Sequence, residues 1–210
     1  MKNIVIIGSG GFAKEVAFLI DDVNKQHKEW NLLGYIDNEI GKQNGKYSVF
    51  QNDEWLKQTN KEISIVFGIG SPPLIEKLSI LFSENENLSF PNIIHPNVIA
   101  DWNRIKIGKG NIICASNTFT TDIEIGNFNI FNLDCTLGHD SLVGNYNVIN
   151  PSVNISGGVD IGDNNLIGTS ATILQFLNIN NDVIIGANSL INKSINEKGV
   201  YVGVPAKRIK

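Results

Sequence analysis

An apolar side chain returns at every sixth position of the chain from Ile107 to Ile191 without a gap. A small or uncharged residue, most often glycine, follows it at each step. Neither the 3.6-residue period of a helix nor the two-residue period of a strand produces a six-residue repeat, whereas a solenoid of hexapeptides does. The apolar positions are Ile107, Ile113, Phe119, Ile125, Phe131, Leu137, Val143, Ile149, Ile155, Ile161, Ile167, Ile173, Ile179, Ile185 and Ile191.

In such a solenoid each hexapeptide supplies one short strand and one corner, and three hexapeptides make one triangular coil. The repeat therefore predicts about five coils, stacked about 4.8 Å apart through parallel-sheet hydrogen bonds. We expect the apolar side chain to point into the prism. We expect the small residue after it to relieve the corner, because glycine and asparagine accept a positive φ at low cost. A β-sandwich with chance periodicity is the weaker alternative, since the repeat never leaves its register.

The chain before the solenoid follows an α/β pattern. Apolar runs at 4–7, 32–36 and 63–67 indicate buried strands, and helical spacing follows the first run at 14–20 and the third run from Pro72 onward. Residues 90–101 resemble a connector. We therefore predict a Rossmann-like βαβ domain at 1–90, followed at 91–210 by a parallel β-helix domain with a C-terminal tail.

The turn after the first strand is the first candidate site. Gly8, Gly10 and Ala13 fit the G-x-G-x-x-G/A pattern between a strand and a helix, where backbone N–H groups can hold a pyrophosphate. Asp37 ends the second strand, where a dinucleotide-binding fold holds a ribose hydroxyl. Three strands are about half of a full dinucleotide domain, so a mononucleotide or nucleotide sugar is a more economical ligand than NAD. A glycine turn that only packs the helix onto the sheet is the alternative.

Of the three histidines, one lies within a coil of the predicted solenoid. His27 occupies a polar stretch and is expected at the surface, while His95 stands at the entry to the solenoid and is expected to be structural. His139 stands at a corner directly before Asp140. A neutral imidazole beside a carboxylate can take a proton from an amine or a hydroxyl group. An exposed histidine without a role at a coil edge is the open alternative.

Composition and charge exclude several classes of function. A formal net charge of −4 without a run of lysine or arginine gives no support for binding nucleic acid or an anionic membrane. The sequence contains neither a long apolar stretch nor a leader-like N-terminus, so we expect no membrane span and no signal peptide. Cys114 and Cys135 are expected to be reduced, structural thiols of a cytoplasmic protein. No cation adjoins Cys135 in the sequence, which disfavours a cysteine acyl-enzyme.

The chain as a whole resembles the bacterial sugar acetyltransferases of the sialic-acid O-acetyltransferase and nucleotide-4-amino-sugar N-acetyltransferase family. The resemblance rests on the glycine-turn domain, the Ile94-His95-Pro96 connector, the unbroken hexapeptide repeat and the tail GVYVGVPAK at 199–207. It implies left-handed β-helices that form homotrimers, with acetyl-CoA in the groove between adjacent solenoids. It also implies a nucleotide-linked sugar bound by the α/β domain.

The resemblance implies roles for individual residues as well. His139 would be the general base and Asp140 would orient its imidazole; no metal is implied. The residues expected at CoA are Asn147, Gly157, Gly168, Gly186, Gly203, Pro205, Lys207 and Arg208. The residues expected at the nucleotide sugar are Gly8, Gly10, Gly11, Phe12, Lys14, Asp37, Asn38 and Gly70.

Two positions depart from the family pattern. Asn147 stands where several amino-sugar N-acetyltransferases carry a second histidine that contacts the acetyl group, so an amide contact is expected there. Phe12 stands where the glycine turn often contains histidine.

From the resemblance as a whole we expect an acetyl-CoA-dependent transferase that acetylates the amino group of a nucleotide-linked 4-amino-sugar for surface-glycan biosynthesis, by direct transfer.

Other functions stay open at this point. A sialic-acid or other sugar O-acetyltransferase is the main alternative, and the sequence does not decide among UDP, dTDP and CMP as the nucleotide. A dinucleotide-dependent enzyme would need a longer α/β domain. A β-helix that only binds a ligand would predict no consequence from the loss of His139. A metal enzyme of the γ-carbonic-anhydrase type needs three converging histidines, and the repeat contains one.

Overall fold

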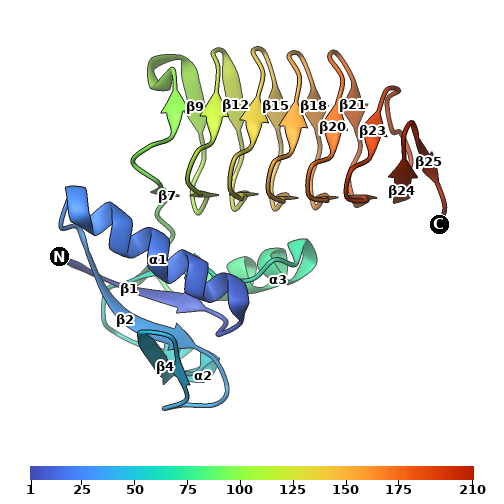
Figure 1. The fold of residues 1–210 in the computed structure, drawn as a ribbon. Coiled ribbons are helices and arrows are strands. Elements are labelled where there is room, and N and C mark those ends of the chain that lie inside the picture. The colour runs from blue at the N-terminus through green and yellow to red at the C-terminus, as the bar shows by residue number, and fades with distance from the viewer.

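The computed structural model describes all residues, 1–210, as an α/β domain beside a β-helix (Figure 1). The axis of the β-helix leads away from the N-terminal domain, so that the C-terminus lies at the far end. The last strand of the α/β sheet ends at Ser89 and the first strand of the β-helix starts at Ile93. A division into domains at residue 90 stays our proposal. No helix is both long and apolar enough to cross a membrane.

The N-terminal domain is a six-stranded sheet with the strand order β3-β4-β2-β1-β5-β6. The three predicted strands form its centre, and the β3–β4 hairpin, the short helix α2 and β6 were not predicted. The elements are β1 (Lys2–Ile7), α1 (Gly11–Gln26), β2 (Trp30–Ile36), β3 (Gln43–Asn44), β4 (Tyr47–Gln51), α2 (Asp53–Gln58), β5 (Ile63–Phe67), α3 (Pro72–Phe82) and β6 (Leu88–Ser89).

The β-helix is a left-handed triangular prism, as predicted, and each of its three faces is one sheet of stacked short strands. The first face contains β7 (Ile93–Ile94), β10 (Ile112–Ile113), β13 (Ile130–Phe131), β16 (Val148–Ile149), β19 (Leu166–Ile167), β22 (Val183–Ile185), β24 (Gly199–Gly203) and β25 (Ala206–Arg208). The second contains β8 (Ile99–Ala100), β11 (Thr118–Phe119), β14 (Thr136–Leu137), β17 (Asn154–Ile155), β20 (Thr172–Ile173) and β23 (Leu190–Ile191). The third contains β9 (Ile105–Ile107), β12 (Ile123–Ile125), β15 (Leu142–Val143), β18 (Asp160–Ile161) and β21 (Asn178–Ile179).

The predicted inward positions form the core of this prism. Every predicted position from Ile113 to Ile191 is buried, and Ile107 is half-buried at the start. The β-helix begins one coil earlier than predicted, because Ile94 pairs with Ile113 and Ala100 pairs with Phe119. From Ile93 onward, the predicted connector at 90–101 is therefore part of the first coil. A short 3₁₀ helix at Trp102–Arg104 interrupts the six-residue spacing there.

The corners differ from the prediction in one respect. The positive φ lies three residues after the inward residue and not one residue after it, as at Asp140 (φ 57°) three residues beyond Leu137. Serine, aspartate, asparagine and aromatic residues hold most of these positions. The residue directly after the inward one is small for another reason: a Cβ at Gly138 would lie 2.7 Å from the carbonyl carbon of Ser156 in the next coil. Close contact between coils, rather than a left-handed conformation, requires glycine there.

The first face of the β-helix packs against the N-terminal domain. Its outward-pointing side chains Ile112, Ile130 and Val148 belong to the same buried cluster as the core of the α/β domain. Equivalent outward positions on the second and third faces carry mostly polar side chains that are exposed, such as Thr136 and Glu124, together with the exposed apolar Ile99 and Leu142. Burial of each aliphatic side chain contributes about 1.5–3 kcal/mol, so this face fixes the two domains together.

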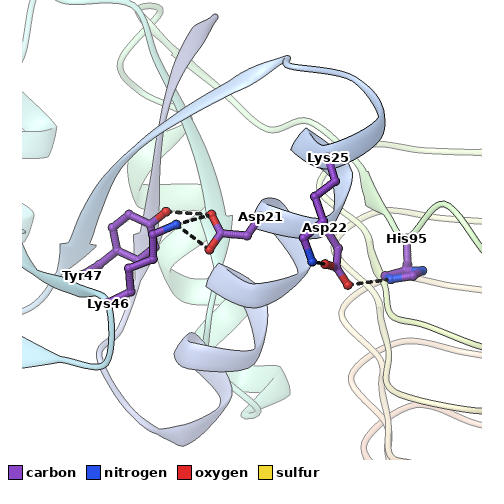
Figure 2. Close-up of polar contacts among 6 residues, drawn as sticks. All are labelled: Asp21, Asp22, Lys25, Lys46, Tyr47 and His95. Carbon is purple, nitrogen blue, oxygen red and sulfur yellow. Dashed lines mark hydrogen bonds and ion pairs between the residues drawn. The ribbon is translucent and has the colours of Figure 1, made fainter.

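Helix α1 is also held on both sides by two adjacent carboxylates (Figure 2). Asp21 accepts hydrogen bonds from Lys46 Nζ at 2.9 Å and from Tyr47 Oη at 2.8 Å, both on the β3–β4 hairpin. Asp22 lies 3.3 Å from His95 Nε2 at the start of the β-helix. The backbone N–H of Asn97 donates to His95 Nδ1, which leaves the proton of the neutral imidazole on Nε2, facing Asp22. His95 thus has the structural position expected for it.

Candidate functional site

The glycine turn after β1 forms an open surface at the carboxyl ends of the parallel strands. Gly8 has φ 88°, and a Cβ at this position would lie 3.0 Å from Ile69 in the second glycine turn. Gly10 is the N-cap of α1, and a Cβ at Gly10 or Gly11 would meet no atom within 4 Å. The first N–H groups of α1 donate no hydrogen bond, and the helix start is open, which is the arrangement that binds a phosphate at a helix N-terminus.

Asp37 lies beside this turn and is held in place by it. Ser9 Oγ donates to Asp37 Oδ2 at 2.6 Å, and the Asn38 N–H donates to Oδ1 at 2.7 Å. Partial burial opposes ionisation, but these hydrogen bonds outweigh it and hold the pKa of Asp37 below its usual value. Asn44 Nδ2 donates to the Ser9 carbonyl at 2.6 Å, so that the β3–β4 hairpin is pinned to the turn. The carboxylate is ionised and keeps lone pairs for a ligand hydroxyl.

The other residues predicted for the nucleotide sugar line the same region. Gly70 is exposed with open space around it, and Asn38 is exposed next to Asp37. Lys14 is exposed on the first turns of α1, with its alkyl chain near Gly45 of the hairpin. Phe12 is half-buried and packs against the core of the domain. The predicted set is thus gathered around one turn, with Phe12 anchored mainly in the core.

His139 lies on the prism edge that joins the second face to the third. We call the stacked corners on this edge, at 120–122, 138–140, 156–158, 174–176 and 192–194, the His139 edge. Nδ1 of His139 lies 2.7 Å from Asp140 Oδ2, and the side chains are 57% and 65% exposed. A carboxylate can only accept, so the proton of the neutral imidazole lies on Nδ1 and Nε2 keeps a free lone pair. This is the tautomer that a general base requires.

Gly157 forms the floor beneath this imidazole. It lies one coil further along the His139 edge, and a Cβ there would be 2.6 Å from His139 Nε2 and 2.7 Å from Cε1. The Gly157 N–H donates no hydrogen bond, although its neighbour Gly158 donates to the His139 carbonyl at 2.7 Å. A free N–H beside a free imidazole nitrogen can hold the oxygen of an acyl group while the nitrogen takes a proton.

The glycine turn and His139 lie on opposite sides of the β-helix within one chain. The N-terminal domain covers the first face, and the His139 edge is the corner opposite that face. In Figure 1 this edge forms the row of loops that points away from the N-terminal domain. A ligand on the glycine turn of one chain therefore does not reach His139 of the same chain.

Three glycines predicted at CoA lie on another edge, between the first and second faces. A Cβ at Gly168 would be 2.5 Å from the Ala187 nitrogen, and one at Gly186 would be 2.6 Å from Val202 Cγ1, so close packing alone explains both glycines. The Gly203 N–H donates to Ser189 Oγ at 3.1 Å on the same edge. Within one chain the structure does not bring these residues to His139.

The residues predicted at CoA in the C-terminal tail are likewise not brought to His139 within one chain. Pro205, Lys207 and Arg208 are exposed on or beside the β24–β25 hairpin, which extends the first face at the C-terminal end. Arg208 Nη1 is paired with Glu197 Oε2. Lys207 makes no ion pair and keeps its charge free for an anion.

The expected acetyl contact at Asn147 is wrong. Asn147 is 0% exposed, and its Nδ2 donates to Asn129 Oδ1 at 3.0 Å and to the Gly162 carbonyl at 2.9 Å. It belongs to an internal ladder with Asn111, Asn129 and Asn165, spaced one coil apart. Such a side chain satisfies the buried backbone of the corner and has no surface to offer a ligand.

The two cysteines are buried structural thiols, as predicted. Burial raises the pKa of Cys114 to about 12 and that of Cys135 to about 11. Neither sulfur is a thiolate near neutral pH, so neither is a nucleophile. No group of three or more histidine, cysteine, aspartate or glutamate side chains is placed to hold a metal ion.

The sequence interpretation missed Ser9 and Asn44 at the nucleotide turn and Phe176 on the His139 edge. Asn44 lies on a two-residue strand whose position no periodicity reveals. The repeat itself could have pointed to Phe176. This residue stands three positions after the inward Ile173, where most other hexapeptides have serine, aspartate or asparagine. Of the positive-φ corners on the His139 edge, this is the one with an aromatic residue.

Residues 3–79 match the PglD N-terminal domain family. The comparison with curated protein sequences gives no match. Among solved structures, the acetyltransferase domain of PglB from Neisseria gonorrhoeae in complex with acetyl coenzyme A is 25% identical, with a TM-score of 0.89 and 99% of each chain covered. WeeI from Acinetobacter baumannii is 26% identical, with a TM-score of 0.88 and 100% of each chain covered. PerB from Caulobacter crescentus, in complex with CoA and GDP-perosamine, is 24% identical, with a TM-score of 0.90 over 100% of this chain and 98% of that chain.

The fold and the site together define a class of protein, the two-domain acyltransferases with an α/β domain and a left-handed hexapeptide β-helix. The likeness extends over the whole chain, and the N-terminal match adds the PglD-type domain. The resemblance to the hexapeptide-repeat sugar acetyltransferases is thereby confirmed, and over its whole length the chain has the fold of an acetyltransferase.

Proposed function

We propose that this protein transfers the acetyl group of acetyl-CoA to the amino group of a nucleotide-linked 4-amino-sugar. The observation that carries the proposal is the His139–Asp140 pair, which leaves Nε2 free and close to the backbone of Gly157, whose N–H donates no hydrogen bond. The phosphate-binding geometry of the glycine turn supports a nucleotide sugar as acceptor. PerB, described with CoA and GDP-perosamine as a perosamine N-acetyltransferase, supports an amine rather than a hydroxyl group as the nucleophile.

In the proposed reaction the neutral amine attacks the thioester carbonyl carbon. His139 Nε2 takes the proton from the amine as the N–C bond forms, while Asp140 stabilises the resulting imidazolium. The Gly157 N–H donates to the carbonyl oxygen as negative charge develops on it. The C–S bond then breaks, and the proton passes to the departing sulfur, which leaves as the thiol of CoA. Two solved variants of the Caulobacter enzyme, in complex with CoA and GDP-perosamine, have the same histidine replaced. They support the choice of a histidine for the role of the base.

We propose that the active enzyme is a homotrimer whose sites lie between chains. The support is geometric: the glycine turn and His139 lie on opposite sides of the β-helix, so a second copy is needed to bring them together. A prism with two uncovered flat faces forms a closed threefold ring readily. In such a ring, the edge with Gly168, Gly186 and Gly203 can approach the His139 edge of a neighbour. Pro205, Lys207 and Arg208 would then adjoin the CoA phosphates there.

We further propose that the protein works in the cytoplasm, where acetyl-CoA and nucleotide sugars are available, and contributes to surface-glycan biosynthesis. Within the nucleotide site, Asp37 and Asn38 would bind the nucleoside. The first turn of α1, with Gly10, Gly11 and Lys14, would bind the pyrophosphate.

The proposal is tested by release of free CoA thiol from acetyl-CoA with a panel of GDP-, UDP- and dTDP-linked 4-amino-sugars. CMP-linked and free sialic acids are the hydroxyl acceptors for comparison. We expect turnover with one nucleotide amino sugar, a loss of at least about 100-fold in kcat for His139→Ala, and unchanged activity for the exposed control His27→Ala. Turnover with a sialic acid alone would replace N-acetylation by O-acetylation. Full activity of His139→Ala would contradict the assignment of the base.

A further inference from the structure

Phe176 is an exposed aromatic residue in a backbone conformation that disfavours it. Its φ is 59°, in the left-handed region, and 71% of its surface is exposed. The corresponding corners of the His139 edge carry Asp122, Asp140 and Gly158, residue types that accept this conformation more readily. Local folding therefore does not account for a phenylalanine at this corner.

Two other aromatic residues occupy corners with positive φ, and both have a structural role. Phe128 is 4% exposed and packs against Phe90 and Phe67 of the N-terminal domain. Tyr146 stacks on Phe128 with the ring centroids 5.6 Å apart. These rings lie at the domain junction, whereas Phe176 lies on the opposite edge, with no part of its own chain to cover it.

The Phe176 ring adjoins the site of acyl transfer. It lies over Gly158, where a Cβ would be 2.7 Å from its Cε1. His139, from the preceding coil, lies over Gly157 in the same way. Two aromatic rings, one from the preceding coil and one from the following coil, therefore contact consecutive glycines of one corner, and the Gly157 N–H in that corner donates no hydrogen bond.

The charges along this edge indicate the direction in which a bound CoA runs. The corner of His139 itself carries the carboxylate of Asp140, and the corner one coil before it carries Asp122, which Arg104 pairs with at 2.6 Å. On the C-terminal side it carries Lys193, which makes no ion pair. Because CoA is polyanionic, its phosphates favour the C-terminal side. The arm that joins the phosphates to the thioester then passes Phe176.

We propose that the Phe176 ring is the apolar wall against which the pantetheine arm of acetyl-CoA packs next to the thioester. This inference rests on the proposed function. The ring accounts for the placement of the thioester carbonyl at the Gly157 N–H, because a wall on one side and His139 on the other fix the acyl group along the edge. It also accounts for an exposed phenylalanine at a strained corner, since the cosubstrate would cover it.

The test is calorimetric titration of the intact protein with acetyl-CoA and with adenosine 3′,5′-bisphosphate, which lacks the pantetheine arm. We expect Phe176→Ala to raise the Kd for acetyl-CoA about tenfold and to leave the Kd for the bisphosphate unchanged, while Phe176→Leu keeps most of the affinity. Phe18→Ala is the matched control, because Phe18 is 62% exposed on α1, in the N-terminal domain. Light scattering of each variant reports the oligomeric state.

An unchanged Kd for acetyl-CoA in Phe176→Ala would overturn this proposal and leave the proposed function intact. Dissociation of the oligomer in Phe176→Ala would also overturn it, because the ring would then be a contact between chains. Absence of acetyl-CoA binding in the unaltered protein would contradict the proposed function itself. An equal loss of affinity for acetyl-CoA and for the bisphosphate would also overturn the proposal. The bisphosphate has no pantetheine arm, so the substitution would then have altered the whole site.

Discussion

The imidazole of His139 rests on the backbone of Gly157, one coil further along the β-helix, so closely that a Cβ on Gly157 would lie 2.6 Å from Nε2. The contact depends on the stacking of coils and not on nearness in sequence. It fixes the height of the ring above the corner, while the 2.7 Å contact with Asp140 fixes its rotation. Both constraints act before any substrate binds.

Gly157→Ala should therefore inactivate the enzyme without unfolding it. The added methyl group would displace the imidazole, which is the end of a flexible side chain, and a displacement of about 1 Å can cost about 100-fold in rate. We expect kcat to fall by roughly this factor, with the denaturation midpoint changed little. Steady-state kinetics and thermal unfolding of the same preparation measure both.

Gly126→Ala is the matched control for that variant. Its Cβ would lie 2.5 Å from the Gly144 carbonyl oxygen, on an edge remote from His139, so the clash is with backbone. We expect a lower denaturation midpoint and an unchanged kcat for the folded protein. If Gly157→Ala retained full activity, the position of His139 over Gly157 would have no catalytic meaning.

Asn44→Ala should weaken binding of the nucleotide sugar alone. It removes the 2.6 Å hydrogen bond from Asn44 Nδ2 to the Ser9 carbonyl, which pins the β3–β4 hairpin to the glycine turn. We expect KM for the nucleotide sugar to rise about tenfold, since a hydrogen bond of this kind contributes about 0.5–1.5 kcal/mol, and KM for acetyl-CoA to stay the same. Gln43→Ala is the control, because the Gln43 side chain bonds only to the Gly45 carbonyl within its own hairpin. An equal rise in both KM values would contradict a local role.

The buried thiols should make the protein less stable at alkaline pH. The pKa values of Cys114 and Cys135 are about 12 and about 11 in the folded chain, against about 8.5 in an unfolded chain. As pH rises above about 8.5 the unfolded state loses these protons first, so the free energy of unfolding falls until the folded thiols ionise as well. At pH 10 the effect is about 2 kcal/mol for each thiol.

Cys114→Ala and Cys135→Ala should each reduce this alkaline loss by that amount. Urea denaturation at pH 8 and pH 10 measures the loss of unfolding free energy between the two pH values. Lysine and tyrosine side chains contribute equally in the variants and in the unaltered chain, so their titration cancels in the comparison. The same loss of stability in the variants and in the unaltered chain would show that the thiols do not contribute. We expect kcat to be unchanged by Cys135→Ala, because the proposed transfer forms no acyl-enzyme.

The β-helix could be predicted from the sequence because each inward position is repeated many times in one register. The first coil was missed because the 3₁₀ turn at Trp102–Arg104 shifts the spacing by one residue. The positive φ was assigned to the wrong corner position because a period gives the spacing of the corners and not the residue at which the chain turns. The Rossmann-like centre was predicted, but short strands such as β3 have too few residues to show a pattern.

The candidate site was predicted unevenly for a similar reason. His139 and Asp140 are adjacent in sequence, so their contact required no knowledge of the fold. Asn147 was assigned to the acetyl group from its distance to His139 along the chain. Its spacing of 18 residues from Asn129 and from Asn165 was visible in the sequence and indicated an internal ladder instead. Only the folded prism shows that His139 lies opposite the face that packs against the glycine-turn domain.

The most direct test of the account is complementation between two inactive variants. His139→Ala keeps the nucleotide site, and Gly10→Trp keeps His139 while filling the open space at the N-terminus of α1. Each should be inactive alone. If each site combines one chain's His139 with a neighbour's glycine turn, refolding the two variants together in equal amounts should restore about a quarter of the activity of the unaltered trimer. At each site the chance of an intact His139 is about one half, and the chance of an intact glycine turn in the neighbour is also about one half. Activity no greater than that of the separate variants would contradict a site shared between chains.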